Sequence, residues 1–448
     1  MRYPSFSSRF LICFAGWLSL SAILGAISTA THAQARMTQS HDVFRVIVFR
    51  HGVRSPTTEP KDLLKYANQP WPLWPVAAGQ MTDHGLKAMH ALGERYRRVL
   101  GIDAHGSVSC QSDNVVAIAD TVERDQFSAQ AFLHGLLPQC QARFSVRPDG
   151  LANSLFHFHV PETVSSSSKS EFPRSLYSRL SELQRILLGC SGVRCWDAAR
   201  AKQVELLWSG KPEPDVFKLA GRLSENLMLE YVQGFPLNQV GWGRSDHASI
   251  GRIIALHNGY FAATKQPVAI AADAASNLMA HIIATLNHAA HRHDDVAPLA
   301  SGQAQSVLLF GHDTNLAQLS GLLGASWHHP KQPDLYPPGG AVLFDLMKKR
   351  ATWYVRVHAF LPTLEALRTG SLKSSAAMVD ISLKLPQCHQ RVLCPLEQFE
   401  AIMKQRIRTD RVDARLEPMV SVSAPLLHRS APSSSTPLGL ANPSLSSQ

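Results

Sequence analysis

The stretch that decides the fold is VFRVIVF over 43–49, followed directly by RHGVRSPT over 50–57. The first part is apolar and β-branched, which predicts a buried strand that ends at the RHG residues. A second run of this kind, SVLLF over 306–310, is followed by GHDTN over 311–315 and then by helical spacing. Since ligands bind beyond the carboxyl ends of strands in open α/β sheets, both polar clusters are expected at that edge.

Periodicity along the chain predicts an α/β fold with a mixed central sheet and flanking helices, plus a mostly helical inserted domain. Further strands are expected over 115–119, 341–346 and 352–357, the last two as a pair, and helices over 172–190, 215–233, 248–263 and 268–292. The expected division is a signal peptide over 1–35, an α/β domain over 36–160 and 301–420, a helical insertion over 161–300, and a disordered Ser/Pro-rich tail over 421–448.

The first 35 residues have the pattern of a secretory signal peptide, with Arg2 and Arg9 before an apolar stretch and the small residues Ala33 and Ala35 at its end. An uncleaved anchor is the alternative, because the stretch is close to the lower length limit for a membrane span. The favoured interpretation makes the mature chain periplasmic or secreted, without stable membrane association.

Cysteine usage agrees with export. Of the seven cysteines, Cys13 lies in the predicted signal peptide, which leaves 7 − 1 = 6. An even number in an exported protein favours disulfides, although about fifteen pairings of six cysteines are formally possible. Their order favours three local pairs, which are Cys110 with Cys140, Cys190 with Cys195, and Cys388 with Cys394. No CxxC or HExxH spacing supports a metal site instead.

Composition excludes several classes of protein. With 45% hydrophobic and 17% charged residues the chain is globular rather than disordered. Lys and Arg total 44 against 34 Asp and Glu, a formal net charge of +10. The basic residues are scattered, so a small anion is the expected partner and nucleic acid is not.

Two arginines, Arg50 and Arg54, bracket His51 directly after the predicted strand. Guanidinium groups match phosphate or carboxylate oxygens bidentately, and Gly52 would let the backbone turn tightly beside the histidine. A lone histidine is usually a core residue and a lone arginine a solvated one. Together, after a buried strand, they predict an anion pocket with His51 at its base.

RHGVRSPT resembles the RHGxRxP signature of the histidine acid phosphatases, a branch of the histidine phosphatase superfamily. Further blocks resemble the family in the same order: ADTVERDQFSAQAF over 119–132, GWGR over 241–244, GHDTNLAQL over 311–319 and QPDLYPPGG over 332–340. The resemblance covers 43 to about 407 and is closest to the bacterial periplasmic 4-phytase and acid phosphatase type.

This resemblance implies hydrolysis of small phosphate monoesters at acid pH, with phytate as a candidate substrate and no cofactor or metal. It implies that His51 is a nucleophile forming a phosphohistidine and that Asp313 protonates the leaving oxygen. The residues that would hold the phosphoryl group are Arg50, Arg54, Arg124 and His312. Thr57 is a candidate substrate contact.

Several alternatives stay open on the sequence alone. Thr57 and Thr58 stand where phytases have Thr-Lys, and Asp125 is expected to weaken polyphosphate binding. A glucose-1-phosphatase or other sugar phosphatase is therefore the main alternative, ahead of a phosphohistidine mutase and of a non-catalytic phosphate-binding protein. The histidine-rich spots at 157–159, 291–293 and 328–329 are interpreted as solvated or locally hydrogen-bonded loops rather than metal sites. The sequence does not determine the oligomeric state.

Overall fold

Strand β1 (Asp42–Arg50) contains the apolar run and lies in the interior of a mixed sheet. The computed structural model describes residues 42–102, 114–138, 140–148, 150–157, 172–213 and 215–423. Within these ranges nine strands form the sheet in the order β7, β6, β5, β1, β4, β2, β3, β9, and β8 pairs with β6. The predicted α/β class with a mixed sheet is confirmed.

The other elements surround this strand. The strands are β2 (Val115–Ala119), β3 (Arg143–Val146), β4 (Ser306–Gly311), β5 (Ala341–Lys349), β6 (Thr352–Pro362), β7 (Met378–Ser382), β8 (Leu393–Pro395) and β9 (Val420–Ser423). The helices are α1 (Pro60–Leu63), α2 (Asp83–Val99), α3 (Glu123–Leu136), α5 (Tyr177–Leu188), α6 (Val193–Ala201), α7 (Val216–Val232), α8 (His247–Ile253), α9 (Ala255–Thr264), α10 (Val268–Ala289), α11 (Asp313–Leu323), α12 (Leu364–Thr369) and α13 (Leu396–Arg406). The expected pair of later strands is the antiparallel pair β5 and β6.

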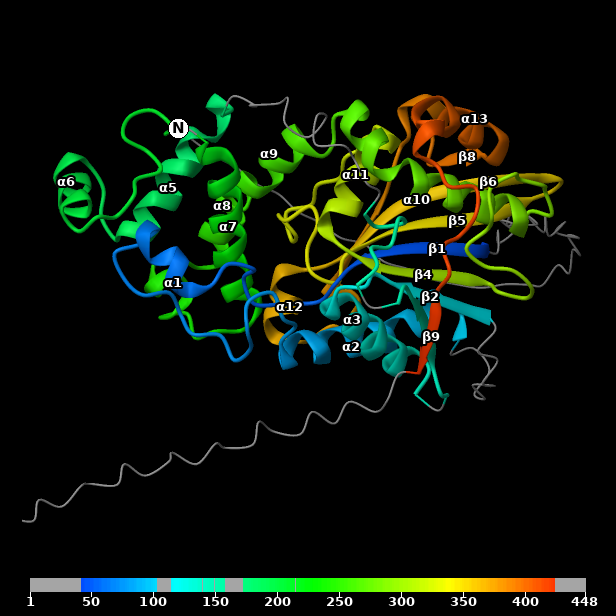
Figure 1. Ribbon diagram of the computed structural model, residues 1–448, viewed down its shortest axis with the longest axis horizontal. Coiled ribbons are helices and arrows are strands. Elements are labelled where there is room, and N and C mark those ends of the chain that lie inside the picture. Colours follow the sequence, from blue (N-terminus) through cyan, green and yellow to red (C-terminus); the bar gives the residue numbers. More distant parts are fainter. Residues whose placement is uncertain are drawn as a thin grey trace, which may run out of the picture. The chain divides into compact units, whose positions relative to one another are not determined.

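Alternate residues of β1 face two different cores. Val46 and Val48 pack with apolar residues of α10, α11 and α13, whereas Ile47 and Phe49 pack with those of α2 and α3. Figure 1 shows α10 and α13 on one side of the sheet and α2 and α3 on the other. A strand buried on both faces is apolar at every position, which explains the unbroken run in the sequence.

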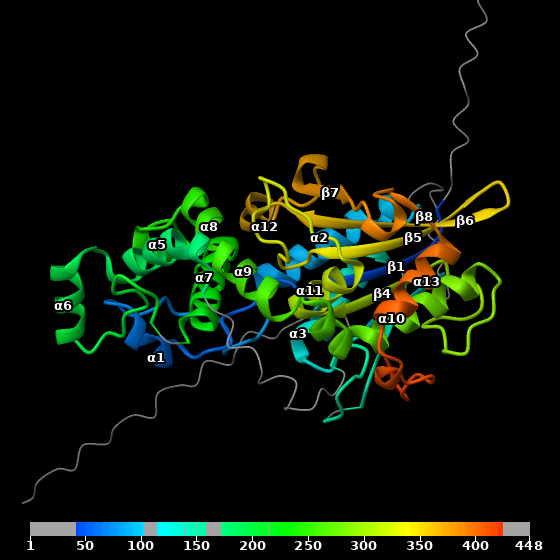
Figure 2. The same cartoon turned by 90° about the horizontal axis from the view of Figure 1, so that it is seen from above.

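A third core is helical. It is built from α5, α7, α8 and α9, and both views place these helices together at one end of the sheet (Figures 1 and 2). Trp71 from the segment after β1 and Leu364 from α12 also belong to it. The helical part is therefore assembled from three stretches of the chain rather than from one insertion, because each stretch contributes apolar side chains to the same core.

Helix α10, which the sequence analysis assigns to the insertion, instead shares a core with the sheet. Its small and aliphatic side chains are buried around most of its circumference, so it packs closely against the strands. By length and composition this 22-residue helix could cross a membrane, but 78% of its most apolar window is buried inside the protein. Burial of this kind is that of a core helix.

The predicted tail begins too early. Residues 421–423 belong to β9, which pairs antiparallel with β3 and so places its backbone groups in the sheet's hydrogen bonds. Residues 424–448 and the predicted signal peptide lie outside the described residues.

Two of the three predicted disulfides are present. The bridges Cys190–Cys195 and Cys388–Cys394 have Cα atoms 5.8 and 5.6 Å apart. Both separations lie within the range of ordinary disulfides. Cys110 lies outside the described residues, so its pairing with Cys140 stays a prediction.

The GWGR block lies in the helical core beside a buried carboxyl group. Glu230 of α7 is 1% exposed and accepts a hydrogen bond of 2.9 Å from the backbone N–H of Gly241. Burial raises the pKa of Glu230 to about 8, although the hydrogen bond from Gly241 acts in the opposite direction. The folded protein therefore keeps a proton on this group near neutral pH.

We expect Glu230→Gln to stabilise the protein at pH 7 and to change little at pH 4. In the unfolded chain a glutamate has a pKa of about 4.3. The stability associated with protonated Glu230 is thus complete below that pH and is lost as the pH rises towards 8. Glutamine removes this loss, for a gain of up to about 3 kcal/mol at about pH 7.

Denaturant unfolding at the two pH values measures the change in the free energy of unfolding. Glu205→Gln is the control, because the side chain of Glu205 is half-exposed. An equal change at both pH values for Glu230→Gln would contradict a protonated carboxyl.

Candidate active site

Three parallel strands end at one edge of the sheet and bring the predicted polar clusters together. In the register of β1, β4 and β2, Arg50 is paired with Gly311, and Ala119 with Phe310. The backbone N–H of His51 donates to the carbonyl of Gly311 at 2.8 Å. The edge expected from the sequence is therefore where the RHG, ADTVER and GHD segments meet.

His51 is held with one ring nitrogen available. The side chain is buried, and its Nδ1 lies 2.9 Å from the carbonyl oxygen of Gly52. A carbonyl only accepts, so Nδ1 carries the proton and Nε2 keeps a lone pair. Burial, together with the charges of Arg124, Arg50 and Arg54, lowers the pKa of His51 well below its ordinary value. The ring therefore stays neutral in mild acid, as a nucleophile requires.

The reason for glycine after this histidine is packing. Gly52 does not have a positive φ angle, so the tight turn expected at this position is not the reason for the glycine. A Cβ at position 52 would lie 2.6 Å from Met81 and 2.7 Å from Met89. Its N–H donates to Ser128 at 3.0 Å. Close approach of α2 to the loop after β1 thus leaves no room for a side chain.

The three predicted arginines surround this histidine. Arg50 and Arg54 are buried, and Arg124 lies in the first turn of α3. In each of them the Nε atom is buried and has no hydrogen-bond partner among the described residues. Buried donors are normally paired, and a bound oxyanion would supply the missing acceptors. These arginines form a positively charged pocket in which their Nε–H groups are available to bind a ligand.

Glu225 of α7 also lies in the pocket, and the sequence analysis missed it. Its carboxylate forms an ion pair with Arg50, and both its oxygens accept from Arg54 at 3.2 and 3.3 Å. Burial raises the pKa of Glu225, but Arg54 and Arg50 lower it by more, so the group is ionised. The available signal was an acidic residue in the middle of an apolar helix.

Asp313 lies beside Arg50 at the start of α11. One carboxylate oxygen is 3.0 Å from Nη2 of Arg50, and the other accepts from the backbone N–H of Thr314 at 2.7 Å. The N-cap position is occupied by His312, whose backbone N–H donates to Asn315. Asp313 is therefore the first helical residue. Its side chain is 13% exposed, so it reaches solvent.

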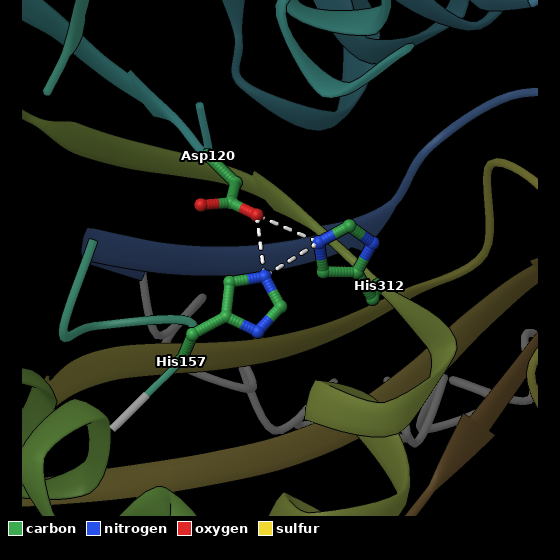
Figure 3. A group of neighbouring side chains, drawn as sticks. All are labelled: Asp120, His157 and His312. Carbon is green, nitrogen blue, oxygen red and sulfur yellow. Dashed lines mark hydrogen bonds and ion pairs between the residues drawn. The ribbon is translucent and has the colours of Figure 1, made fainter. Parts of the chain in front are cut away.

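His312 is tied to two neighbouring residues through its two ring nitrogens. Nε2 lies 2.7 Å from Oδ2 of Asp120, and Nδ1 lies 3.3 Å from Nη2 of Arg124. Since guanidinium only donates, Nδ1 accepts and Nε2 carries the proton that goes to Asp120. Burial lowers the pKa of His312 even though Asp120 acts against it. His157 joins the group from a loop, with Nε2 at 2.7 Å from the same oxygen of Asp120 (Figure 3).

Asp125 behaves differently from the expectation. It is completely buried, and burial raises its pKa well above the ordinary value although the charge of Arg124 opposes this. The group is therefore neutral in acid and adds no negative charge to the pocket. The weakening of polyphosphate binding expected from this residue is not supported by its environment.

Thr57, the candidate substrate contact, lies on the surface with its side chain exposed.

Comparisons with known proteins agree with this architecture. Residues 44–174 and 217–359 match the model of the histidine phosphatase superfamily (branch 2). The chain is 29% identical to phytase AppA of Escherichia coli (strain K12) over 397 residues, which is 80% of this chain and 90% of that protein. It is 26% identical to glucose-1-phosphatase of Salmonella typhimurium over 417 residues, covering 85% and 97% of the two chains.

A solved structure, the Hafnia alvei phytase in complex with myo-inositol hexakis sulphate, is similar in fold. It superposes with a TM-score of 0.70 at 26% identity and covers 83% of this chain and 98% of its own. The family match spans more than half of the sequence and includes the segments that supply His51, Arg124 and His312. The chain therefore belongs to branch 2 of the histidine phosphatase superfamily.

Proposed function

We propose that the chain hydrolyses phosphate monoesters through a phosphohistidine formed on His51. That it is a phytase-like phosphoric monoester hydrolase follows from its family and from its phytase and glucose-1-phosphatase relatives. The observation that carries the proposed mechanism is the Nε2 lone pair of a buried, neutral His51 surrounded by three arginines. A neutral nucleophile in a cationic pocket is what attack on a phosphoryl dianion needs.

In the first step, Nε2 of His51 attacks phosphorus and the ester P–O bond breaks. Asp313 gives its proton to the departing alkoxide, which leaves as an alcohol. In the second step, water attacks the phosphohistidine, Asp313 takes a proton from that water, and inorganic phosphate is released. Atoms and protons balance without an added cofactor.

The charge on the phosphoryl oxygens is stabilised by the groups around them. Arg50, Arg54, Arg124 and His312 are the proposed phosphoryl-binding groups. The arginines donate directly and are positioned before the reaction, so that little reorganisation is required, whereas His312 contributes by accepting from Arg124 through Nδ1. Glu225 competes with the phosphoryl group for the same two arginines, because its carboxylate already pairs with Arg50 and Arg54. Binding of substrate therefore displaces a carboxylate rather than water alone.

We propose export and an acidic optimum from the sequence and from the site. The signal-peptide pattern and the cysteine usage support a periplasmic or secreted enzyme. The lowered pKa of His51 keeps the nucleophile neutral in acid, whereas the general acid has to carry a proton. Acid conditions satisfy both requirements.

Phytate is the proposed substrate, and a sugar phosphate is the second candidate because glucose-1-phosphatases are among the relatives. A panel of phytate, glucose 1-phosphate and p-nitrophenyl phosphate, assayed at about pH 4–6, tests this. We expect release of phosphate from the aryl ester and from phytate, with glucose 1-phosphate slower. A faster rate for glucose 1-phosphate would favour the sugar phosphatase, and no release from any ester would refute the function.

A further inference from the structure

Beside the pocket, three metal-ligating atoms lie within hydrogen-bond distance of one another. Oδ2 of Asp120 is 2.7 Å from Nε2 of His157 and 2.7 Å from Nε2 of His312, and the two nitrogens are 3.1 Å apart. Figure 3 shows the two rings and the carboxylate converging from different segments of the chain. A second carboxylate, Asp125, has Oδ2 3.5 Å from Nε2 of His312.

Hydrogen bonds leave this cluster only partly satisfied. Both imidazoles can donate to Oδ2 of Asp120, but their two N–H groups then face each other without a bond. Oδ1 of Asp120 and both oxygens of Asp125 are buried and lack a partner in the part of the chain that the structure describes. Asp120 and Asp125 are each 0% exposed. An unpartnered oxygen of the buried Asp120 carboxylate is costly, and a cation would supply what this carboxylate lacks.

The geometry points to a site for a divalent transition-metal ion of the Zn²⁺ class at Asp120, His157 and His312, and we propose that its occupation inhibits the enzyme. Zinc takes imidazole nitrogen and carboxylate oxygen at about 2.0–2.2 Å. An ion at that distance from the three converging atoms would lie about 1 Å outside their plane. The carboxylate of Asp120 and the two neutral imidazoles supply three ligand atoms, and the fourth position of a tetrahedral zinc site is left for water. The half-exposed ring of His157 gives access from solvent.

Inhibition follows from the proton positions on His312 and rests on the proposed function. Nδ1 of His312 accepts from Arg124, so Nε2 carries the ring proton. A metal on Nε2 requires a lone pair there, which moves that proton to Nδ1. The hydrogen bond from Arg124 is then lost, and its guanidinium is also repelled by the ion. Arg124, one of the groups proposed to hold the phosphoryl oxygens, thereby loses its position beside His312.

The test compares the wild type, His157→Asn and His293→Asn, with ZnCl₂ as the probe. Asparagine at position 157 can still donate to Asp120 but removes the imidazole ligand. His293 is the matched control, because it is an exposed histidine 3.5 Å from a carboxylate of Asp295. Binding of Zn²⁺ is measured by calorimetry, and inhibition by initial rates with p-nitrophenyl phosphate, since phytate itself binds metals. Melting curves confirm that all three proteins are folded.

We expect one Zn²⁺ per chain, inhibition of the wild type over the same concentration range, and at least about a tenfold weakening of both in His157→Asn, because even outer groups of metal sites contribute 10–100-fold. His293→Asn should match the wild type. Equal binding or equal inhibition in wild type and His157→Asn would overturn the site. Binding without inhibition would overturn the coupling to His312. Calorimetry does not depend on turnover, so an inactive wild type would refute the proposed function while the metal site is still tested.

Discussion

His51→Ala abolishes turnover while leaving the fold intact: this is the expected result if His51 is the nucleophile. Removing it deletes the covalent route altogether, and losses of about 10⁴-fold or more are typical when a nucleophile is removed. The side chain makes a local hydrogen bond to the carbonyl of Gly52, so its loss disturbs few distant contacts. We expect a decrease in stability no larger than about 1–3 kcal/mol, the usual range for a single substitution.

The measurement is kcat/KM with p-nitrophenyl phosphate, together with rapid quenching to trap phosphate on the protein. The wild type should carry acid-labile phosphate and the variant none. His281→Ala is the matched control, because His281 is also buried and its Nδ1 lies 2.7 Å from a backbone carbonyl, that of Ala297. It should lose stability and keep its rate. Near-normal turnover in His51→Ala would rule out the phosphohistidine.

The part of the site that could be predicted from the sequence is the part that is local in the chain. Arg50 and His51 follow a strand whose continuous apolar run marks it as buried on both faces, and GHDTN follows a second such strand. Parallel pairing then brings the two segments together without any knowledge of side-chain contacts. Adjacency in the sequence and the rule for strand ends were sufficient.

The groups that come from elsewhere in the chain could not be predicted in this way. Glu225 reaches Arg50 across 175 residues, and Asp334 is 3.5 Å from the same guanidinium across 284. A buried acid in an apolar helix indicates that some partner exists but does not identify it. His157 is similar, since a histidine in a polar loop is ordinarily solvated, and only the fold brings it to Asp120.

The charge state of Asp125 shows a further limit. In sequence it is an acid next to an arginine, and the expected consequence was extra negative charge. In the folded protein, burial outweighs the attraction of Arg124 and the pKa rises. Whether a carboxyl group is charged depends on the balance between desolvation and nearby charge, and both quantities are properties of the fold.

Asp313→Asn is expected to slow esters of basic alcohols far more than an aryl ester. Sugar and inositol alkoxides need a proton as the P–O bond breaks, whereas p-nitrophenolate departs with little assistance. General acid catalysis supplies about 10²–10⁴-fold, so the slowing of phytate or glucose 1-phosphate should exceed that of p-nitrophenyl phosphate by about this factor. The measurement is the ratio of variant to wild-type kcat/KM for each substrate.

Stability should change little in this variant. At the start of the helix the side chain of Asn315 accepts a hydrogen bond from the backbone N–H of His312. Asparagine at position 313 can still accept from the N–H of Thr314. Arg50 retains Glu225 and Asp334 as partners. A matched control is Asp273→Asn, which removes a buried carboxylate that pairs with Arg408 at 2.7 Å on the far helix α10. That variant should lower the melting temperature and leave kcat/KM unchanged for both substrates.

A purely positioning role for Asp313 predicts a different pattern. In that case the substitution acts only by loosening the guanidinium of Arg50, which lies 3.0 Å from the Asp313 carboxylate. Arg50 is proposed to contact the phosphoryl oxygens, which all the substrates share, and its displacement would slow every ester by the same factor. Leaving-group dependence is therefore the property that distinguishes proton donation from positioning. Equal slowing of phytate and p-nitrophenyl phosphate, with an unchanged melting curve, would show that Asp313 acts by positioning Arg50. The leaving group would then be protonated by water.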